Sequence, residues 1–404
     1  MSNLPSVVVK PSRQFPFLSR HPWVHVRSLA DTAETFPLGQ EVDLVQHDGT
    51  WLARGLFNPN SGLRVRLYTW DRDQNLDDAF FGQRLDEAIA RRRLAGFLDS
   101  PNEQGTVEGV TSAARLVFSE SDGLSGLIVD QYADCLVVQI AAGAIAARQT
   151  ALLDHLQNRL QPRAIFLRTD AKTAKKEGID QQEGLARGQA PSESTLYEQN
   201  GIQLSVDLEH GQKTGAYLDQ RDNHAVAAKY LVGRRVLDMC CYAGGFGLVA
   251  AARGAAHITA VDSSDRALEL AAANAQRNGL QQFTFEKADC FDYFAKGDPP
   301  MFDAVVLDPP RFAGSRRQVD AAIRAYAKLN RGAIDRLPPG GILVTNSCSG
   351  SVSRSDFLNM LVDVGRRAQR DVIVLESRSA AADHPMRVSC PETDYLKCFI
   401  CEVR

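Results

Sequence analysis

The feature that most constrains the fold of this 404-residue chain is an alternation of apolar strand-like runs and helices from about residue 195 onward. One expected helix, Arg266–Arg277, is followed by Asn278-Gly279, a pair suited to a helix C-cap. Such alternation predicts a parallel, doubly wound α/β sheet. The expected strands are Val236–Met239, Ile258–Val261, Phe283–Phe285, Ala304–Leu307, Ile342–Thr345, Val372–Leu375 and Tyr395–Val403.

A chain of this length exceeds one ordinary hydrophobic core, so more than one domain is expected. Residues 1–73 contain short strand-like runs separated by turn residues, which predicts a small β-barrel or compact β domain. Residues 74–194 mix strands with helices near 77–98 and 146–160, as in an α+β domain. The polar stretch 169–194 is expected to be a loop before the Rossmann-like domain at 195–404.

Acidic residues lie at the carboxyl ends of the first four expected strands of that sheet. They are Asp238, Asp262, Asp289 and Asp308. In doubly wound sheets ligands bind beyond the carboxyl ends of the strands. We expect Asp262 to bind both hydroxyls of a ribose and Asp289 to meet an adenine amino group. A helix N-cap is the alternative for any single aspartate, but it explains the ordered set of four less well.

The turn after the first strand, 238–247, is rich in glycine, including Gly244 and Gly245. Glycines there let the backbone approach a ligand closely. The spacing is not Gly-x-Gly-x-x-Gly, which argues against a dinucleotide and against an NAD-dependent oxidoreductase.

Local basic clusters, and not the net charge, indicate that this chain binds nucleic acid. The net charge is −3, so an RNA partner must be bound by a local patch. Lys10, Arg13, Arg20 and Arg27 lie in an N-terminal segment without acids, and we expect them to contact RNA phosphates. The cluster Arg91–Arg93 suits either a second basic patch or a solvated helix face.

The eight cysteines and the lengths of the apolar runs indicate the cellular compartment and whether a metal is bound. Without an apolar run of membrane length or a visible secretory signal, a cytoplasmic protein with free thiols is expected. Cys398 and Cys401 lie on an expected buried strand, and no second ligand pair has metal spacing. Core packing is therefore expected for them, and no metal.

Several stretches together resemble the class I methyltransferases, and more narrowly the RlmI-type bacterial family of 23S rRNA 5-methylcytosine methyltransferases. The matching stretches are 211–222, 238–247, 308–312, 346–350 and 383–385, with His21-Pro22-Trp23 and 119–130 nearer the N-terminus. The resemblance covers nearly the whole chain. It implies an RNA-binding PUA domain, a middle αβ domain and a catalytic domain that uses S-adenosylmethionine on 23S rRNA. It also implies a cofactor site that includes Gln212, Tyr217, Gln220, Arg221, Tyr242, Ser263 and Cys290 beside the acids and glycines above.

Methylation at cytosine C5 needs a thiolate that adds to C6, because C5 alone is a poor nucleophile. Cys348 is expected in this role, since it follows the strand Ile342–Thr345 at the carboxyl edge of the sheet, and the resemblance implies the same position. Asp308 is a candidate to bond the cytosine N3/N4 edge. Phe312 is a candidate to stack on a flipped base and His384 to line the target pocket, with structural roles as alternatives for both.

Two other functions stay open on the same sequence. One is RNA methylation at a guanine nitrogen, which needs no thiol. The other is a non-catalytic RNA-binding assembly factor with a vestigial cofactor pocket, against which the four intact acids argue. A homodimer is a further open expectation.

Overall fold

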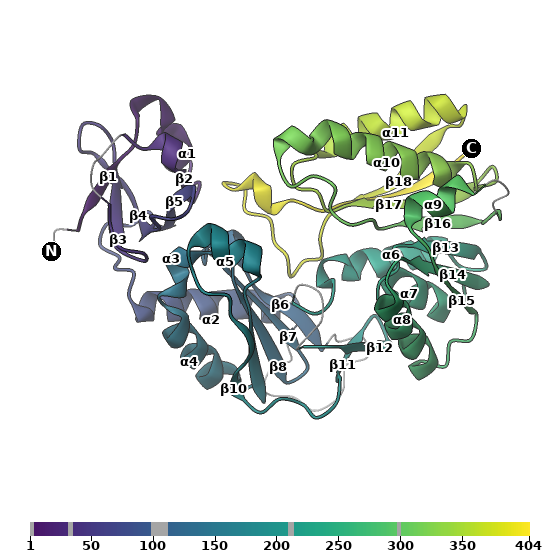
Figure 1. The fold of residues 1–404 in the computed structure, drawn as a ribbon, viewed down its shortest axis with the longest axis horizontal. Coiled ribbons are helices and arrows are strands. Elements are labelled where there is room, and N and C mark those ends of the chain that lie inside the picture. The colour runs from purple at the N-terminus through teal and green to yellow at the C-terminus, as the bar shows by residue number, and fades with distance from the viewer. Residues whose placement is uncertain (1–3, 31–34, 98–111, 209–213, 297–299) are drawn as a thin grey trace.

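The computed structural model describes residues 4–30, 35–97, 112–208, 214–296 and 300–404. Within these ranges the strands form four sheets that follow one another along the chain (Figure 1). A five-stranded N-terminal sheet is followed by a five-stranded middle sheet, a two-stranded hairpin and a seven-stranded C-terminal sheet. None of the helices in the described ranges is long and apolar enough to cross a membrane.

The N-terminal sheet has the strand order β1-β3-β4-β5-β2 around its own apolar core, which includes Val24, Val42 and Leu67. The strand-like runs of the sequence, at 7–9, 41–45, 51–57 and 63–68, correspond to β1, β3, β4 and β5; the three-residue strand β2 was not predicted. The short helix α1 (Phe15–Leu18) buries Phe17 against this core. The strands are β1 (Ser6–Val8), β2 (Trp23–His25), β3 (Glu41–Val45), β4 (Trp51–Phe57) and β5 (Leu63–Thr69).

The middle sheet has the order β10-β9-β8-β7-β6, and α2 (Asp78–Leu94) packs against it near β6. Asp77 caps α2 by accepting a hydrogen bond from the Phe80 amide. Two further helices are α3 (Gly143–Ala146) and α4 (Gln149–Leu160). The strands are β6 (Ala113–Phe118), β7 (Leu127–Tyr132), β8 (Cys135–Ile140), β9 (Ala164–Arg168) and β10 (Glu183–Gly188).

The prediction of a loop over 169–194 is wrong. Asp170 caps helix α5 (Ala171–Glu177), and Gly178 ends it with a left-handed φ of 70°. The edge strand β10 then pairs antiparallel with β9. An edge strand is bonded on one side only and is largely solvated, so its polar sequence resembles that of a loop.

The hairpin of β11 (Thr195–Gln199) and β12 (Ile202–Val206) joins the middle sheet to the C-terminal sheet. Tyr197, Leu204 and Val206 belong to one apolar cluster with Tyr132 of β7 and Val236 of the C-terminal sheet. These two parts of the chain therefore share a continuous core.

The C-terminal sheet has the order β15-β14-β13-β16-β17-β19-β18. β13 through β17 are parallel as predicted, but β19 runs antiparallel to both of its neighbours, which corrects the expectation of a wholly parallel sheet. The strands are β13 (Arg235–Met239), β14 (His257–Asp262), β15 (Phe283–Lys287), β16 (Ala304–Leu307), β17 (Gly341–Ser347), β18 (Val372–Arg378) and β19 (Lys397–Val403).

Helices cover both faces of this sheet (Figure 1). One face carries α6 (Arg221–Tyr230), α7 (Gly245–Ala252) and α8 (Asp265–Arg277). The other carries α9 (Cys290–Ala295), α10 (Val319–Ile334) and α11 (Arg354–Ala368). The predicted α8 is confirmed to within one residue.

Arg92 joins the middle sheet to the C-terminal part of the chain, although the sequence suggested a surface cluster at 91–93. Its side chain is only 2% exposed. Its guanidinium pairs with Asp122 at 2.7 Å and donates to the carbonyls of Arg115 and Asp383, each at 2.8 Å. Arg91 pairs with the same Asp122 from the surface, with a side chain 46% exposed.

We expect Arg92→Met to lower the free energy of unfolding by about 3–5 kcal/mol, because it removes the buried cation paired with Asp122 and the guanidinium donors to two carbonyls. The matched control Arg91→Met removes an exposed partner of the same carboxylate and should cost less than about 1 kcal/mol. Urea unfolding followed by circular dichroism measures both. Equal losses for the two variants would contradict this role of Arg92.

Candidate active site

The strand order places a ligand site at the carboxyl end of β13. β14 and β16 lie on either side of β13, so the direction of chain progression reverses there. The following turn is strained, because Cys240 and Tyr242 hold left-handed φ angles of 61° and 47°. Gly244, with φ of 87°, precedes α7, and a Cβ on Gly245 would lie 2.4 Å from the His224 ring. Both glycines are therefore required by the turn itself.

Asp238 is a buried carboxylate at this turn. Its Oδ2 accepts the Gly247 amide at 2.9 Å, while its Oδ1 has no hydrogen-bond partner in the described part of the chain. Burial raises the pKa of Asp238 to about 7, and the charge of Asp262 acts in the same direction. A buried polar atom without a partner fits a site completed by a ligand that brings donors.

Asp262 and Asp289 have different surroundings. The two carboxylate oxygens of half-buried Asp262 accept the amides of Tyr242 and Ser264, each at 3.0 Å. This fixes the carboxylate beside the turn, with exposed Ser263 next to it. Asp289 is exposed and caps α9, as the N-cap alternative anticipated. Its contact with adenine stays a prediction.

Asp308 follows β16 and is held by the segment before α6. Its Oδ1 accepts a hydrogen bond from the Gln220 amide at 2.9 Å. The Tyr217 ring stands perpendicular to the Tyr242 ring, with centroids 5.2 Å apart. Burial raises the pKa of Tyr217, and the charges of Tyr242, Asp308 and Cys348 act in the same direction. The predicted residues Tyr217, Gln220, Tyr242 and Asp308 are thus brought together.

Arg221 and His384 are directed toward Asp383. Arg221 is 3% exposed, pairs with Asp383 at 2.9 Å and donates to the Ala113 carbonyl at 3.0 Å. His384 Nδ1 lies 2.8 Å from the same carboxylate. Burial acts to raise the pKa of Asp383, but His384, Arg221 and the Arg115 amide hold it well below its usual range. In this structure Arg221 joins separate segments of the chain, and His384 holds the carboxylate of its neighbour Asp383.

Cys348 follows β17 in a loop tied to the Asp308 loop. The Ser349 hydroxyl accepts the amides of Phe312 and Ala313 at 3.2 and 3.1 Å and lies 3.0 Å from the Tyr326 hydroxyl. Ser347 bonds the same tyrosine at 3.0 Å. Both serines are fully buried, so their hydroxyls hold the loops together. Cys348 between them is partly exposed.

Lys397 is a site residue that the sequence analysis did not identify. It begins β19 and pairs across the sheet with Ser347, the neighbour of Cys348. Its ammonium donates to the Ser349 and Tyr395 carbonyls at 2.7 and 2.8 Å. Burial lowers the pKa of Lys397 to about 8, and the charge of Cys348 acts in the opposite direction. No sequence signal places Lys397 there, because the antiparallel course of β19 creates the contact.

The remaining predicted residues lie as follows. Phe312 is half-buried against Tyr326, with ring centroids 4.8 Å apart, and borders the core beneath α10. Cys290 begins α9 and its thiol shares a hydrogen bond with Cys240. Gln212 lies outside the described residues.

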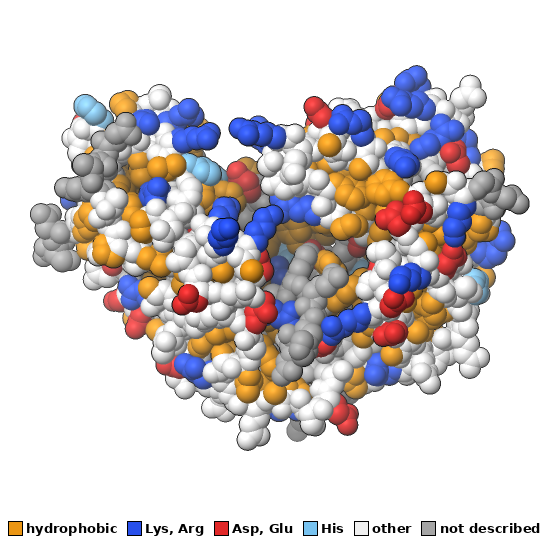
Figure 2. All heavy atoms as spheres, in the orientation of Figure 1, with side chains coloured by type: hydrophobic (Ala, Val, Ile, Leu, Met, Phe, Trp, Pro, Cys, Tyr) orange, Lys and Arg blue, Asp and Glu red, His pale blue; other side chains and the backbone are white. Residues whose placement is uncertain are grey.

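The N-terminal basic residues differ in their contacts, and their role in RNA binding stays a prediction. Lys10 donates to the Arg27 carbonyl at 3.3 Å, and Arg13 and Arg27 are exposed. Arg20 lines a pocket facing the middle sheet. Figure 2 shows Lys and Arg side chains gathered around the hollow between the N-terminal sheet and the C-terminal sheet.

His21, Cys390 and Glu392 could offer ligand atoms within 4.8 Å of one another. His21 Nδ1 accepts the Trp23 amide, so Nε2 carries the proton and donates to Glu392 at 3.2 Å. The group therefore acts here as a hydrogen-bonded contact between the N-terminal sheet and the loop before β19.

Two family models match the chain. A PUA-like domain model covers residues 7–70, and an S-adenosylmethionine-dependent methyltransferase model covers residues 185–381. A putative methyltransferase solved with SAH superposes with a TM-score of 0.83 at 20% identity, over 99% of this chain and 100% of that one. A putative SAM-dependent methyltransferase from Streptococcus mutans gives 0.82 at 19%, with the same coverage. Fold and site thus define an S-adenosylmethionine-dependent methyltransferase with an N-terminal PUA-like domain.

Relatives of nearly equal length identify the family. A protein named ribosomal RNA large subunit methyltransferase I from Shewanella denitrificans is 39% identical over 98% of this chain and 99% of its own. A protein of the same name from Tolumonas auensis is 40% identical over 97% of this chain and 98% of its own length. The chain belongs to the ribosomal RNA large subunit methyltransferase I family.

We expect Lys397→Met to shift the midpoint of Cys348 alkylation to higher pH. Lys397 is protonated below its pKa of about 8, and its charge favours the thiolate there. Iodoacetamide labelling of Cys348, followed by peptide mass spectrometry across a pH series, measures the shift. Lys397→Arg keeps the charge and should restore the wild-type profile. An unchanged profile in Lys397→Met would mean that the ammonium only supports the loops.

Proposed function

We propose that this chain methylates C5 of a cytosine in large-subunit 23S rRNA, through a covalent adduct between Cys348 and cytosine C6. The observation that carries the proposal is the partly exposed thiol of Cys348 at the carboxyl edge of a methyltransferase sheet, in a loop hydrogen-bonded to the loop that follows Asp308. The names of the full-length relatives support ribosomal RNA as the substrate.

The cofactor residues in this proposal surround the turn after β13. Each carboxylate oxygen of Asp262 accepts one backbone amide and keeps a further lone pair. With these lone pairs Asp262 accepts hydrogen bonds from the ribose hydroxyls. Asp238 accepts a donor at its unpaired oxygen, and Gly244 and Gly245, which pack against Leu248 and His224, shape the turn beside the ligand. S-adenosylmethionine supplies an electrophilic methyl group at this site.

Cys348 performs the covalent step. Its thiolate adds to C6 of cytosine, and the electron pair of the C5–C6 bond makes C5 a nucleophile toward the methyl group. The methyl donor is released as S-adenosylhomocysteine. The C5 proton then passes to water, its bond electrons re-form the C5–C6 double bond, and the thiolate leaves C6, which restores the aromatic ring. Lys397 stabilises the thiolate by its charge, and Asp308, oriented by Gln220, accepts hydrogen bonds from the cytosine edge.

The target base must leave the helical stack for Cys348 to reach C6. The N-terminal basic residues and the PUA-like domain would hold the surrounding backbone through phosphate contacts. In this arrangement the phosphates position the RNA, and the side chains around Cys348 select the base.

We expect Asp262→Ala to weaken S-adenosylmethionine binding about tenfold or more, because it removes hydrogen bonds to a charged acceptor worth about 1.5–3 kcal/mol. Isothermal titration calorimetry measures this. Asp265→Ala, an exposed aspartate in the first turn of α8, is the matched control and should bind normally. Normal binding by folded Asp262→Ala would show that the ribose lies elsewhere.

We expect Cys348→Ser to fold, to bind the cofactor and to lose methyl transfer by several orders of magnitude, because a serine hydroxyl is far less nucleophilic than a thiolate at neutral pH. Transfer of a radiolabelled methyl group to protein-free 23S rRNA measures the loss. Cys401→Ser, at a cysteine buried in β19, is a control for the loss of a thiol as such.

The wild-type chain should also form a covalent complex with RNA that carries 5-fluorocytosine, because fluorine blocks loss of the C5 substituent. The complex should migrate as a shifted band on a denaturing gel and be absent for Cys348→Ser. If Cys348→Ser methylates at nearly the wild-type rate, the thiol is structural, and methylation at a guanine nitrogen becomes the better proposal.

A further inference from the structure

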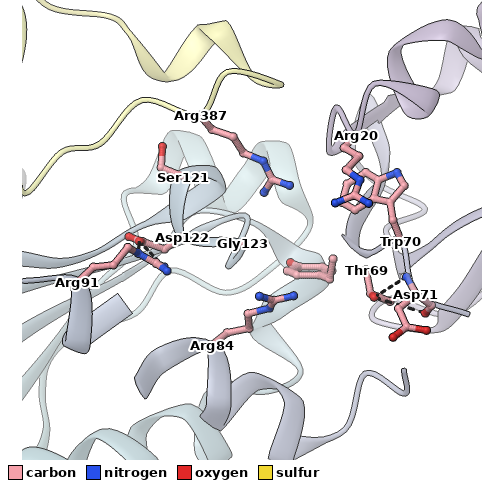
Figure 3. Close-up of a pocket in the computed structure, with 11 residues that line it drawn as sticks. Arg20, Thr69, Trp70, Asp71, Arg84, Arg91, Ser121, Asp122, Gly123 and Arg387 are labelled. Atoms are coloured by element: carbon pink, nitrogen blue, oxygen red, sulfur yellow. Dashed lines mark hydrogen bonds and ion pairs between the residues drawn. The ribbon is translucent and has the colours of Figure 1, made fainter. Parts of the chain in front are cut away.

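A polar cavity of about 370 Å³ lies at the junction of three parts of the chain, away from the β13 turn. Trp70 and Arg20 approach it from the N-terminal sheet, Arg84 comes from α2, and Arg387 comes from the loop between β18 and β19 (Figure 3). A ligand here would contact segments that are far apart in sequence.

Three guanidinium groups converge on this cavity. Figure 3 shows Arg20, Arg84 and Arg387 pointing toward one another across it. The fourth arginine of the wall, Arg91, is turned away and paired with Asp122. The other wall carboxylate, Asp71, accepts the Asp73 amide and points away from the three arginines.

The local acids do not balance this charge. Arg84 pairs with Glu87 at 2.9 Å, and Arg387 donates to the Glu120 carbonyl and to Ser389. The Arg20 side chain has no hydrogen bond or ion pair within the described ranges. Burial lowers the pKa of Arg387; the charges of Arg84 and Arg20 act in the same direction, and those of Cys390 and Glu120 act against it. Like charges held together in this way favour a bound anion.

The position of Arg20 is not explained by the local backbone. It follows α1 with a φ of 63°, a left-handed conformation that favours glycine. The turn therefore does not require an arginine, yet the side chain is aimed into the cavity. A strained residue whose side chain faces a pocket is a reason to look for a ligand there.

Among anions, the side chains that line the cavity favour a phosphodiester of a nucleic acid. A guanidinium group binds two phosphate oxygens at once, and three guanidinium groups surround this one cavity. The Arg387 guanidinium lies 5.6 Å from the centroid of the Trp70 ring, which adds an aromatic surface beside the cationic centre.

We propose that Arg20, Arg84 and Arg387 bind one backbone phosphate of the substrate RNA, outside the target-base pocket. The inference rests on the proposed function for the identity of the polyanion. The cavity is linked to the candidate active site through the chain. Arg387 lies four residues after Asp383, which pairs with Arg221. The residue before Arg221, Gln220, donates a hydrogen bond to Asp308. A phosphate bound here would fix the position of the RNA relative to the N-terminal sheet, the middle sheet and the loop that leads to the catalytic centre.

The test is the salt dependence of binding to a protein-free transcript of 23S rRNA. The variant Arg20→Gln/Arg84→Gln changes an exposed and a half-buried side chain and should fold normally. Its affinity should fall about tenfold or more. The slope of log affinity against log salt should flatten by about 0.7–1, the value for one lost phosphate contact. Cofactor binding should not change.

Arg253→Gln is the matched control. Arg253 is exposed at the end of α7, which runs from the carboxyl edge of the sheet to the opposite edge. It should bind RNA with the wild-type affinity and slope. A double variant whose slope equals that of Arg253→Gln would overturn the phosphate site.

Two further outcomes separate the possibilities. Calorimetry with inorganic phosphate at constant ionic strength tests a free anion. If wild type binds it, the double variant does not, and RNA affinity is unaltered, the cavity serves a small anion and the RNA assignment is wrong. If the slope flattens but wild type forms no adduct with 5-fluorocytosine RNA, the phosphate site stands and the proposed cytosine chemistry fails.

Discussion

The buried carboxylate of Asp383 is the contact on which the arrangement of this molecule depends. Its two oxygens bind Arg221, His384 and the Arg115 amide, and its carbonyl accepts a hydrogen bond from Arg92. These partners come from α6, the loop before β19, β6 and α2. Because a buried charge without partners is strongly destabilising, each of these segments has to reach the same point.

That constraint also positions the catalytic centre. Arg221 begins α6 directly after Gln220, and Gln220 holds Asp308 by a hydrogen bond. Asp308 precedes the loop whose amides bind Ser349, next to Cys348. A hydrogen-bonded series therefore connects the middle sheet to the thiol. Positioning by fixed side chains on a rigid sheet suits the proposed reaction, in which a nucleophile and a methyl donor meet on the same base.

The electrostatics of the centre are divided between two edges. The acids Asp238 and Asp262 surround the β13 turn, where burial raises the pKa of Asp238 to about 7. The cation Lys397 stands at β17 and β19, where burial lowers its pKa to about 8. Acidic groups thus gather on the side proposed for the cofactor ribose, and a positive charge lies beside the thiol. The arginines around the outer cavity extend the positive field toward RNA.

The sequence by itself determined the parallel strands β13 to β17 and the placing of Asp238, Asp262 and Asp308 at their ends. Local periodicity and the carboxyl-edge rule need only neighbouring residues. It could not determine the elements within 169–194, since an edge strand such as β10 lacks an apolar pattern. Nor could it place Arg92 in the interior or Lys397 beside Cys348, because both depend on partners distant in the chain. Arg20, Arg84 and Arg387 share a cavity for the same reason: only tertiary packing decides which distant charges meet.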